Sequence, residues 1–280
     1  MTFQANVSAD AVEEKPYLSL GADLSTDQKS KVLELLDVDE KALDQYNIVT
    51  VTNADEHKYL DKYLDASIIG TRALSSVLVV GKEAGNGIHV TTKNISYCTE
   101  GMYRNALLTA GIEDADITVA GPFSISGTAA LVGAIKAYET MTGEEIDDEN
   151  LDAANDELVL TGKLVEDIGD SEKAEDLMAL VKQEVAENKL TSAEDIQNVV
   201  DQACDQLDIQ LSEENQKQIA ELMKKIEGLD LDVDKLKDQA KDLYQKLEDL
   251  DFHVDKESVG NFFTRIIDAI VNFFQGLFGK

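Results

Sequence analysis

The sequence predicts an α+β or α/β protein, with a mixed-sheet α/β domain over residues 17–143 followed by an all-helical part over residues 144–255. Strand-like runs alternate with helix-like periods in the first part, and strand signals vanish in the second. The final residues, 256–280, carry one amphipathic pattern and are expected to form an apolar C-terminal helix. Residues 1–16 are expected to be a disordered or post-signal leader.

Within the α/β part the predicted order of elements is β-α-β-α-β-β-α-β-α, which indicates a mixed sheet with helices packed on it. Asn53 is expected to cap its helix, with Glu56 completing a capping-box pair. The Gly-rich segment 81–87 predicts a hairpin between its flanking strands, and Gly121-Pro122 predicts a turn. The predicted strands are 17–20, 47–52, 73–80, 88–92 and 117–120, and the predicted helices are 25–36, 53–64, 99–110 and 127–141.

The second part reads as a series of amphipathic helices. Ser171, Ser192 and Ser212 are each expected to be N-caps. Apolar residues at alternating spacings of three and four form a heptad seam from Ile219 to Val254, interrupted near Gly228. The seam fits two helices that share a packing face, either in an intramolecular bundle or in a coiled-coil oligomer. The predicted helices are 149–160, 171–188, 192–207, 212–227, 233–250 and 256–278.

The charge of the chain limits its partners. The formal net charge is −31, with 11 Lys/Arg and 20 Asp/Glu in residues 1–142 but 14 and 36 in residues 143–280. Nucleic acid is not an expected partner, because its phosphates would be repelled. A basic peptide or protein is compatible with this charge, and so is the simpler interpretation that the charge only maintains solubility.

The two cysteines and the acidic runs give no metal or cofactor signature. Cys98 and Cys204 lack zinc or redox spacing; they are possible disulfide partners outside the cytoplasm and small buried hydrophobes inside it. The Asp-x-Asp-x-Asp run that begins at Asp230 opens like a calcium loop, but Lys235 and Lys241 occupy the positions that require Gly and Glu. We therefore expect no bound metal and no cofactor.

Two strand-to-helix loops are the candidate ligand-binding positions. Ligands in α/β proteins bind beyond the carboxyl ends of strands, and N–H groups at a helix start can hold an anion. Neither loop contains a complete phosphate-binding or nucleophile-elbow motif. The candidate residues are Asn53, Asp55, Ser124, Ser126, Gly127 and Thr128.

The C-terminal segment has the clearest partner-binding pattern. Written as a helix, residues 256–280 place ten large apolar side chains on one broad face. This face is expected to dock on the protein's own body, on a protein partner or second copy, or on a lipid surface as a peripheral contact. Its polar face is not enriched in Lys or Arg, which favours protein over membrane. The apolar residues are Phe262, Phe263, Ile266, Ile267, Ile270, Val271, Phe273, Phe274, Leu277 and Phe278.

Four runs make the chain resemble the YpuA-like family, secreted proteins of Gram-positive bacteria that form a domain of unknown function. They are VTNADE at 51–56, SYCTEGMY at 96–103, AGPFSISGTAAL at 120–131 and LDLDVD at 229–234. The resemblance covers roughly residues 17–250, and it implies an extracellular or cell-envelope location. It carries over no catalytic residues, and the charged and apolar regions of a signal peptide do not precede residue 16.

These observations favour a non-enzymatic secreted or envelope interaction protein, which could also form a homo-oligomer. The alternative is an envelope hydrolase or transferase with its site at the loops near Asn53 and Ser126.

Overall fold

A mixed five-stranded sheet forms the centre of the N-terminal half. The computed structural model describes residues 15–83, 85–143, 145–229 and 231–236. The strand order is β2-β1-β3-β5-β4, in which β3 runs antiparallel to the four other strands. The strands are β1 (Tyr17–Gly21), β2 (Asn47–Val51), β3 (Ser76–Gly81), β4 (Ile88–Ile95) and β5 (Ala115–Ile125).

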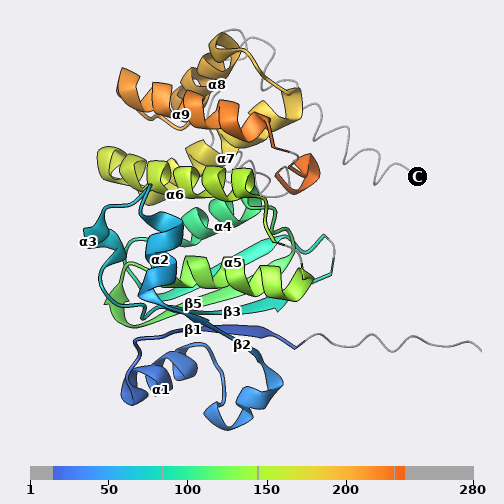
Figure 1. The fold of residues 1–280 in the computed structure, drawn as a ribbon. Helices are drawn as coiled ribbons and strands as arrows, with labels where there is room; N and C mark the ends of the chain where they lie inside the picture. Colours follow the sequence, from blue (N-terminus) through green and yellow to red (C-terminus); the bar gives the residue numbers. More distant parts are fainter. Residues whose placement is uncertain (1–14, 84, 144, 230, 237–280) are drawn as a thin grey trace, which may run out of the picture. The chain divides into compact units, whose positions relative to one another are not determined.

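Helices cover both faces of the sheet, and further helices pack outside them (Figure 1). The first half contains α1 (Thr26–Leu35), the 3-10 helix η1 (Glu40–Gln45), α2 (Asn53–Leu60), α3 (Ala66–Ile69), α4 (Glu100–Thr109) and α5 (Thr128–Thr142). The second half contains α6 (Asp148–Ile168), α7 (Ser171–Asn188), α8 (Ala193–Gln206) and α9 (Glu213–Glu227). The prediction of an α+β fold with a helical second half is confirmed.

Successive side chains of β1 point to opposite faces of the sheet. Leu18 and Leu20 pack with Val32 and Leu33 of α1 in a small core on one face. The other face packs against α5, which approaches closely because Gly133 has no side chain. A Cβ atom at Gly133 would lie 2.4 Å from the Ser19 Oγ atom. This contact fixes α5 on the sheet, and the N-terminus of α5 forms part of the site described below.

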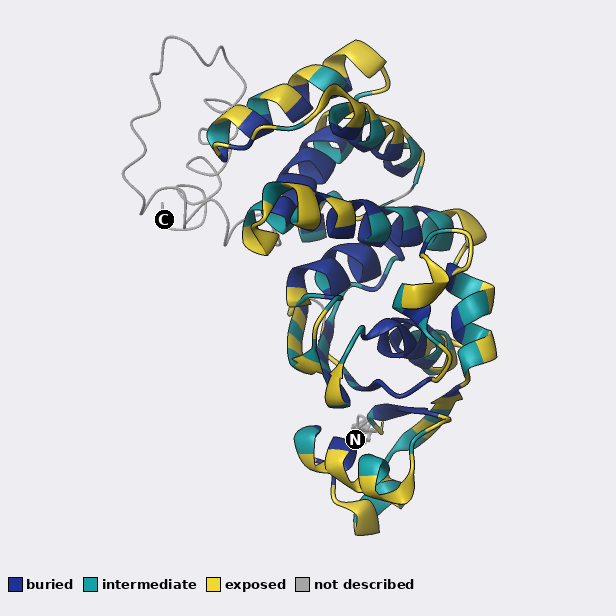
Figure 2. Cartoon of the chain, turned by 90° about the vertical axis from the view of Figure 1, so that its left-hand side faces the viewer, coloured by how far each residue is buried: buried dark blue, intermediate teal, exposed yellow. Residues whose placement is uncertain are grey.

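The second half packs on the first and contains one fully buried ion pair. Helices α6 and α7 pack on α4, and α8 and α9 pack on α6 and α7, with exposed residues on their outward faces (Figure 2). Leu158 of α6 belongs to the same hydrophobic core as the sheet. The Lys182 Nζ atom of α7 lies 2.9 Å from the Glu157 Oε1 atom of α6, and both side chains are fully buried. The core therefore continues from the sheet layer into the helical layer.

The hairpin predicted around segment 81–87 is wrong. Strands β3 and β4 do not pair, because β3 lies between β1 and β5. The chain returns through α4, which makes β4 parallel to β5. Parallel neighbours require a crossover of this kind. The predicted turn at Gly121-Pro122 is also wrong, since β5 continues to Ile125.

Two predicted caps are displaced by one residue. Thr52, not Asn53, caps α2, and its capping-box partner is Asp55. Asp170, not Ser171, caps α7. The caps at Ser192 and Ser212 are confirmed. In both displaced cases the preceding residue has a competent side chain and an extended backbone, so the helix begins one residue earlier.

The heptad seam divides at Gly228. Ile219, Leu222 and Ile226 are buried on α9, which packs on α8, α6 and α7 as in an intramolecular bundle. Helix α9 ends at Glu227, and Leu236 is buried in the core that contains the sheet. Residues 237–280, including the rest of the seam and the predicted apolar helix, lie outside the described residues, as do residues 1–14.

Candidate functional site

Four strands deliver their carboxyl ends to the same edge of the sheet. Strands β1, β2, β4 and β5 are parallel to one another, since each pair is either directly parallel or related through the antiparallel β3. Helices α2, α4 and α5 begin just beyond this edge. The edge of an α/β sheet where parallel strands end is the usual position of a ligand site.

Glu56 lies at the centre of this edge. Its side chain is 1 % exposed, and it projects from α2 toward the first residue of α5. The Thr128 hydroxyl donates to the Glu56 Oε1 atom at 2.7 Å, and the Asn53 Nδ2 group donates to the Oε2 atom at 3.2 Å. Burial raises the pKa of the Glu56 carboxyl, although these two hydrogen bonds act in the opposite direction. Glu56 is thus a buried carboxyl whose oxygens accept from two neutral groups.

The loop before α5 is held by Tyr103 and Cys98. Gly127 has a φ of 97°, and a Cβ atom there would lie 2.5 Å from the Tyr103 Oη atom. The Tyr103 hydroxyl donates to the Gly127 carbonyl at 2.6 Å. The Cys98 N–H donates to the Ser126 carbonyl at 3.0 Å. Only glycine satisfies both the left-handed backbone and the close approach of the tyrosine.

A hydroxyl chain leads from the loop to the carboxyl. The Ser126 Oγ atom lies 3.3 Å from the Thr128 Oγ1 atom, and Thr128 donates to Glu56. Ser126 is half-buried, whereas Thr128 and Glu56 are buried. A proton at the Ser126 hydroxyl is therefore connected through Thr128 to a carboxyl whose pKa is raised. This arrangement can position a proton, but its inner two members are closed off from solvent.

The cysteine at this edge is not an activated nucleophile. Burial raises the pKa of the Cys98 thiol to about 12, so the thiol is protonated at neutral pH. Burial also raises the pKa of Cys204, in α8, to about 11. Both cysteines are free and buried, and Cys98 belongs to the core around the sheet. The disulfide that the sequence left open between them is not formed.

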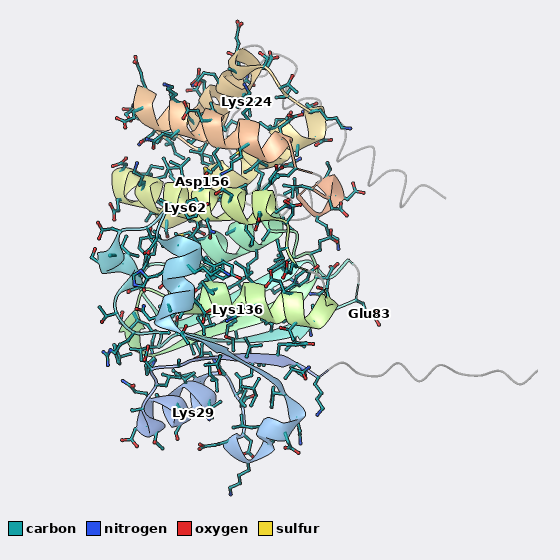
Figure 3. All side chains as sticks on the ribbon, viewed as in Figure 1. Lys29, Lys62, Glu83, Lys136, Asp156 and Lys224 are labelled. Atoms are coloured by element: carbon teal, nitrogen blue, oxygen red, sulfur yellow. The ribbon has the colours of Figure 1, made fainter. Side chains whose placement is uncertain are left out.

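Asp55 lies on the outer side of α2 and stabilises it. Its carboxylate accepts from the Thr52 N–H at 2.8 Å and lies 3.2 Å from the Lys136 Nζ atom of α5, which Figure 3 labels. Desolvation raises the pKa of Asp55, but the bonds from Thr52 and the charge of Lys136 outweigh it and lower the pKa. Asp55 therefore joins α2 to α5 as a charged carboxylate.

The structure brings together most of the residues that the sequence predicted for a site. Asn53, Ser126, Gly127 and Thr128 converge, and Glu56 is the link between the two loops. Ser124 is exposed in β5. The sequence predicts only a capping role for Glu56, and it does not place Tyr103 or Cys98 at these loops. Glu56 lies with Leu60 on the buried face of α2, which begins at the end of a strand. A carboxyl group on the face that otherwise carries apolar residues is the signal that could have identified it.

The two histidines in the described part of the chain do not join this site. The His57 Nδ1 atom lies 2.5 Å from the Asp61 Oδ1 atom on the surface of α2, and His89 Nε2 lies 3.0 Å from the Asn86 carbonyl. His253 is outside the described residues. Within the described part of the chain, no three His, Cys, Asp or Glu side chains are grouped to hold a metal ion. None of the helices described there is long and apolar enough to cross a membrane.

Comparison with known proteins assigns the family. Residues 20–243 match the model described as "Protein of unknown function (DUF1002)". The chain belongs to this family. This DUF1002 member is 41 % identical over 272 residues to the uncharacterized protein YpuA of Bacillus subtilis (strain 168). The aligned region covers 95 % of this chain and 92 % of that protein. No solved structure matches the chain.

Proposed function

We propose that this DUF1002 member is a non-enzymatic interaction protein of the cell envelope or the extracellular space, and that residues 256–280 are its partner-binding element. The proposal is supported by the distribution of large apolar side chains along the chain. Among the described residues, the exposed large hydrophobic side chains are Ile48 and Phe123. The sequence of residues 256–280 contains ten large apolar residues, which would share one face if the segment formed a helix. The terminal segment is therefore the part of the chain best suited to bind a partner through apolar contacts.

Energy and charge define the expected partner. Removing a large apolar side chain from water contributes about 1.5–3 kcal/mol, so the terminal face gains from a covered position. The net charge of −31 attracts a basic surface and repels anionic lipid headgroups. A protein or peptide with a basic rim around an apolar groove fits both properties. A second copy of this chain fits the apolar face but not the charge.

The proposal is tested by placing charges on the two faces of the terminal segment. In the producing bacterium, Ile267→Asp with Phe274→Asp is expected to move at least half of the protein from the envelope fraction to the soluble fraction. Thr264→Asp with Asn272→Asp adds the same charge to the polar face and is expected to leave the distribution unchanged. Equal distributions for the two double variants would contradict a role for the apolar face.

A second candidate function rests on the convergence at the carboxyl edge. The hydroxyl chain from Ser126 through Thr128 to Glu56 is an arrangement from which a hydrolase or transferase could act on an acyl group. Its test is turnover of chromogenic acetyl and butyryl esters by the purified chain. Turnover that Ser126→Ala abolishes and Ser124→Ala preserves would favour this function. Turnover that survives in Ser126→Ala would exclude the site as its source.

A further inference from the structure

The residues that follow α9 turn back onto the α/β part of the molecule. Residues 231–236 are called the strap here. Leu236 is 1 % exposed and belongs to the core around the sheet, and Leu231 packs against the same core. Asp232 caps a single helical turn: its Oδ1 atom accepts the Asp234 N–H at 2.9 Å, and its carbonyl accepts the Leu236 N–H at 3.2 Å. The strap is thus ordered by its own turn and by two apolar contacts.

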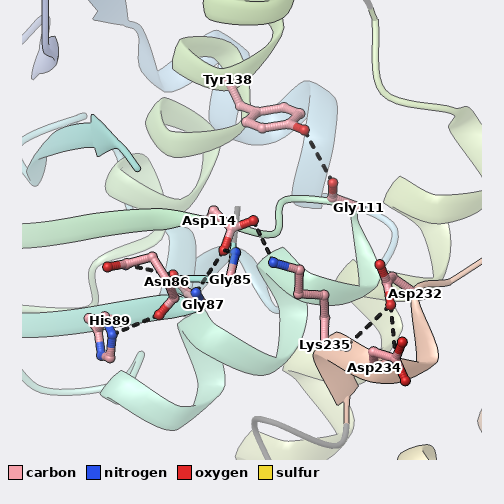
Figure 4. Close-up of polar contacts among 10 residues, drawn as sticks. All are labelled: Gly85, Asn86, Gly87, His89, Gly111, Asp114, Tyr138, Asp232, Asp234 and Lys235. Atoms are coloured by element: carbon pink, nitrogen blue, oxygen red, sulfur yellow. Dashed lines mark hydrogen bonds and ion pairs between the residues drawn. The ribbon is translucent and has the colours of Figure 1, made fainter. Parts of the chain in front are cut away.

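One ion pair connects the strap to the body. The Lys235 Nζ atom lies 2.5 Å from the Asp114 Oδ2 atom, and each side chain is 12 % exposed (Figure 4). The Asp114 Oδ1 atom accepts the N–H groups of Gly85 and Gly87 at 3.0 and 2.7 Å. Asp114 therefore joins three segments: the β3–β4 loop, the start of β5 and the strap. Lys235 contributes to only one of these connections.

Some charges around the Lys235–Asp114 pair hold the strap on the body, and others repel it. Glu113 is adjacent to Asp114, and both Asp232 of the strap and Asp114 raise its pKa, whereas Lys235 lowers it. Desolvation is the largest cause of that raised pKa. Lys235 thus offsets the repulsion among three carboxylates. Without its charge, the charged side chains of the strap would all be negative, and Asp232 would lie near the carboxyls of Glu113 and Asp114 with no cation of the strap beside them.

We propose that the strap is a releasable tether, held on the body by the Lys235–Asp114 pair. When the strap is held, the described chain is fixed to the body at Leu236 in the core. When the strap is released, the last fixed point of the described chain is Gly228, after the end of α9. The eight residues 229–236 span roughly 26 Å when extended. Opening the strap would therefore lengthen the connection between α9 and the sequence after Leu236 by up to that distance.

The test reads the strap itself by hydrogen exchange. In the full chain, Lys235→Met is expected to raise amide exchange in residues 231–236 by at least 5-fold, without changing exchange in α9. Lys224→Met, at an exposed position on α9 labelled in Figure 3, removes the same charge and is expected to change neither. Asp114→Asn is expected to release the strap and also to raise exchange in residues 82–89. Unchanged protection of the strap in Lys235→Met would overturn the proposal.

A measurement on the unmodified chain guards against a variant that fails to fold. Salt screens a partly exposed pair more than it weakens buried apolar contacts. Raising the salt concentration from 20 mM to 500 mM is expected to accelerate exchange in the strap at least 2-fold while β3 and β5 keep their protection. Loss of protection in the strap and the sheet together would show that the strap opens only by global unfolding, which would also overturn the proposal. Neither readout depends on the proposed partner binding.

Discussion

Two glutamates, the buried Glu56 and the half-buried Glu175, lie at the beginnings of helices that start from the same sheet edge. Glu56 accepts from Thr128, the first residue of α5, and Glu175 of α7 accepts from Thr99, the N-cap of α4. Desolvation raises the pKa of both carboxyls. A carboxylate is favoured at a helix N-terminus by the helix dipole, which partly offsets the cost of burial. In each case the carboxyl comes from another element, so it fixes how two helices meet.

The raised pKa of Glu56 makes a signed prediction for stability against pH. A carboxyl whose pKa is higher in the folded protein than in the unfolded chain destabilises the fold increasingly as pH rises from about 4.5 through the folded pKa. Glu56→Gln removes this titration. The free energy of unfolding of Glu56→Gln, relative to the unmodified chain, is therefore expected to increase from pH 4.5 to pH 7. Urea denaturation at pH 4.5 and pH 7 measures this difference in unfolding free energy between the variant and the unmodified chain. A difference that does not change with pH would contradict the raised pKa of the Glu56 carboxyl.

The two thiols give a second prediction at this scale. Cys98 and Cys204 are buried and their pKa values are raised to about 12 and about 11. Reaction with a thiol reagent such as DTNB at pH 8 is expected to be slow in the folded protein and to reach two equivalents per chain in 6 M guanidinium. The protein should be purified without reductant. Zero equivalents after denaturation would instead show that the two cysteines had formed a disulfide.

At the level of the elements, close packing of α5 on the sheet depends on Gly133. The Ser19 side chain occupies the space that a side chain at position 133 would need, and the Val77 Cγ1 atom would lie 3.2 Å from an added Cβ atom. Gly133→Ala is expected to lower the free energy of unfolding by about 1–3 kcal/mol, as for other overpacked cores. Gly228→Ala is the matched control, because Gly228 has a helical φ of −70° and its nearest neighbour would lie 3.4 Å away. The control is expected to be neutral or stabilised by up to about 1 kcal/mol. Equal effects of the two changes, measured by urea denaturation, would contradict the close approach.

The buried pair between α6 and α7 predicts a non-additive result. Lys182 also donates to the Asn105 carbonyl at 2.9 Å and to the Thr109 hydroxyl at 3.1 Å, so it connects both helices to α4. Lys182→Met or Glu157→Leu alone leaves one buried charge without its partner, and each is expected to cost about 3–5 kcal/mol of unfolding free energy. The double variant is expected to be more stable than either single variant. Additive losses in this cycle would mean that the two side chains do not interact.

The helices and strands were easier to predict than the pairing of the strands. Periodicity and N-caps located α8 and α9, because Ser192 and Ser212 start each helix and apolar spacing continues to its end. Strand pairing was not predictable in the same way, because the segment before β4 contains hairpin-type glycines although β3 already has two neighbours. Pro122 resembled a turn residue, yet the pairing of β5 with β3 ends at Ala120, so β5 can include a residue without an N–H. The two candidate loops lie together because both follow parallel strands, which end at the same edge of the sheet.

The whole molecule combines a self-contained body with a terminal segment of different character. In the described residues, Glu56 is bonded to Thr128 and Glu157 is paired with Lys182, and the core continues from the sheet into the helical layer. The strap contributes Leu236 to that core. The sequence beyond it concentrates five of the eight phenylalanines of the chain in residues 262–278. This contrast is the physical basis for assigning partner binding to the terminal segment.

Site-specific photo-crosslinking in the cells that produce the protein tests the proposed partner binding most directly. The photoreactive residue benzoylphenylalanine is placed at Phe273, expected on the apolar face, or at the adjacent Asn272, expected on the polar face, in otherwise unmodified chains. The account predicts a discrete protein adduct from position 273 and little or none from position 272. Absence of an adduct at position 273, or equal adducts from both positions, would contradict it.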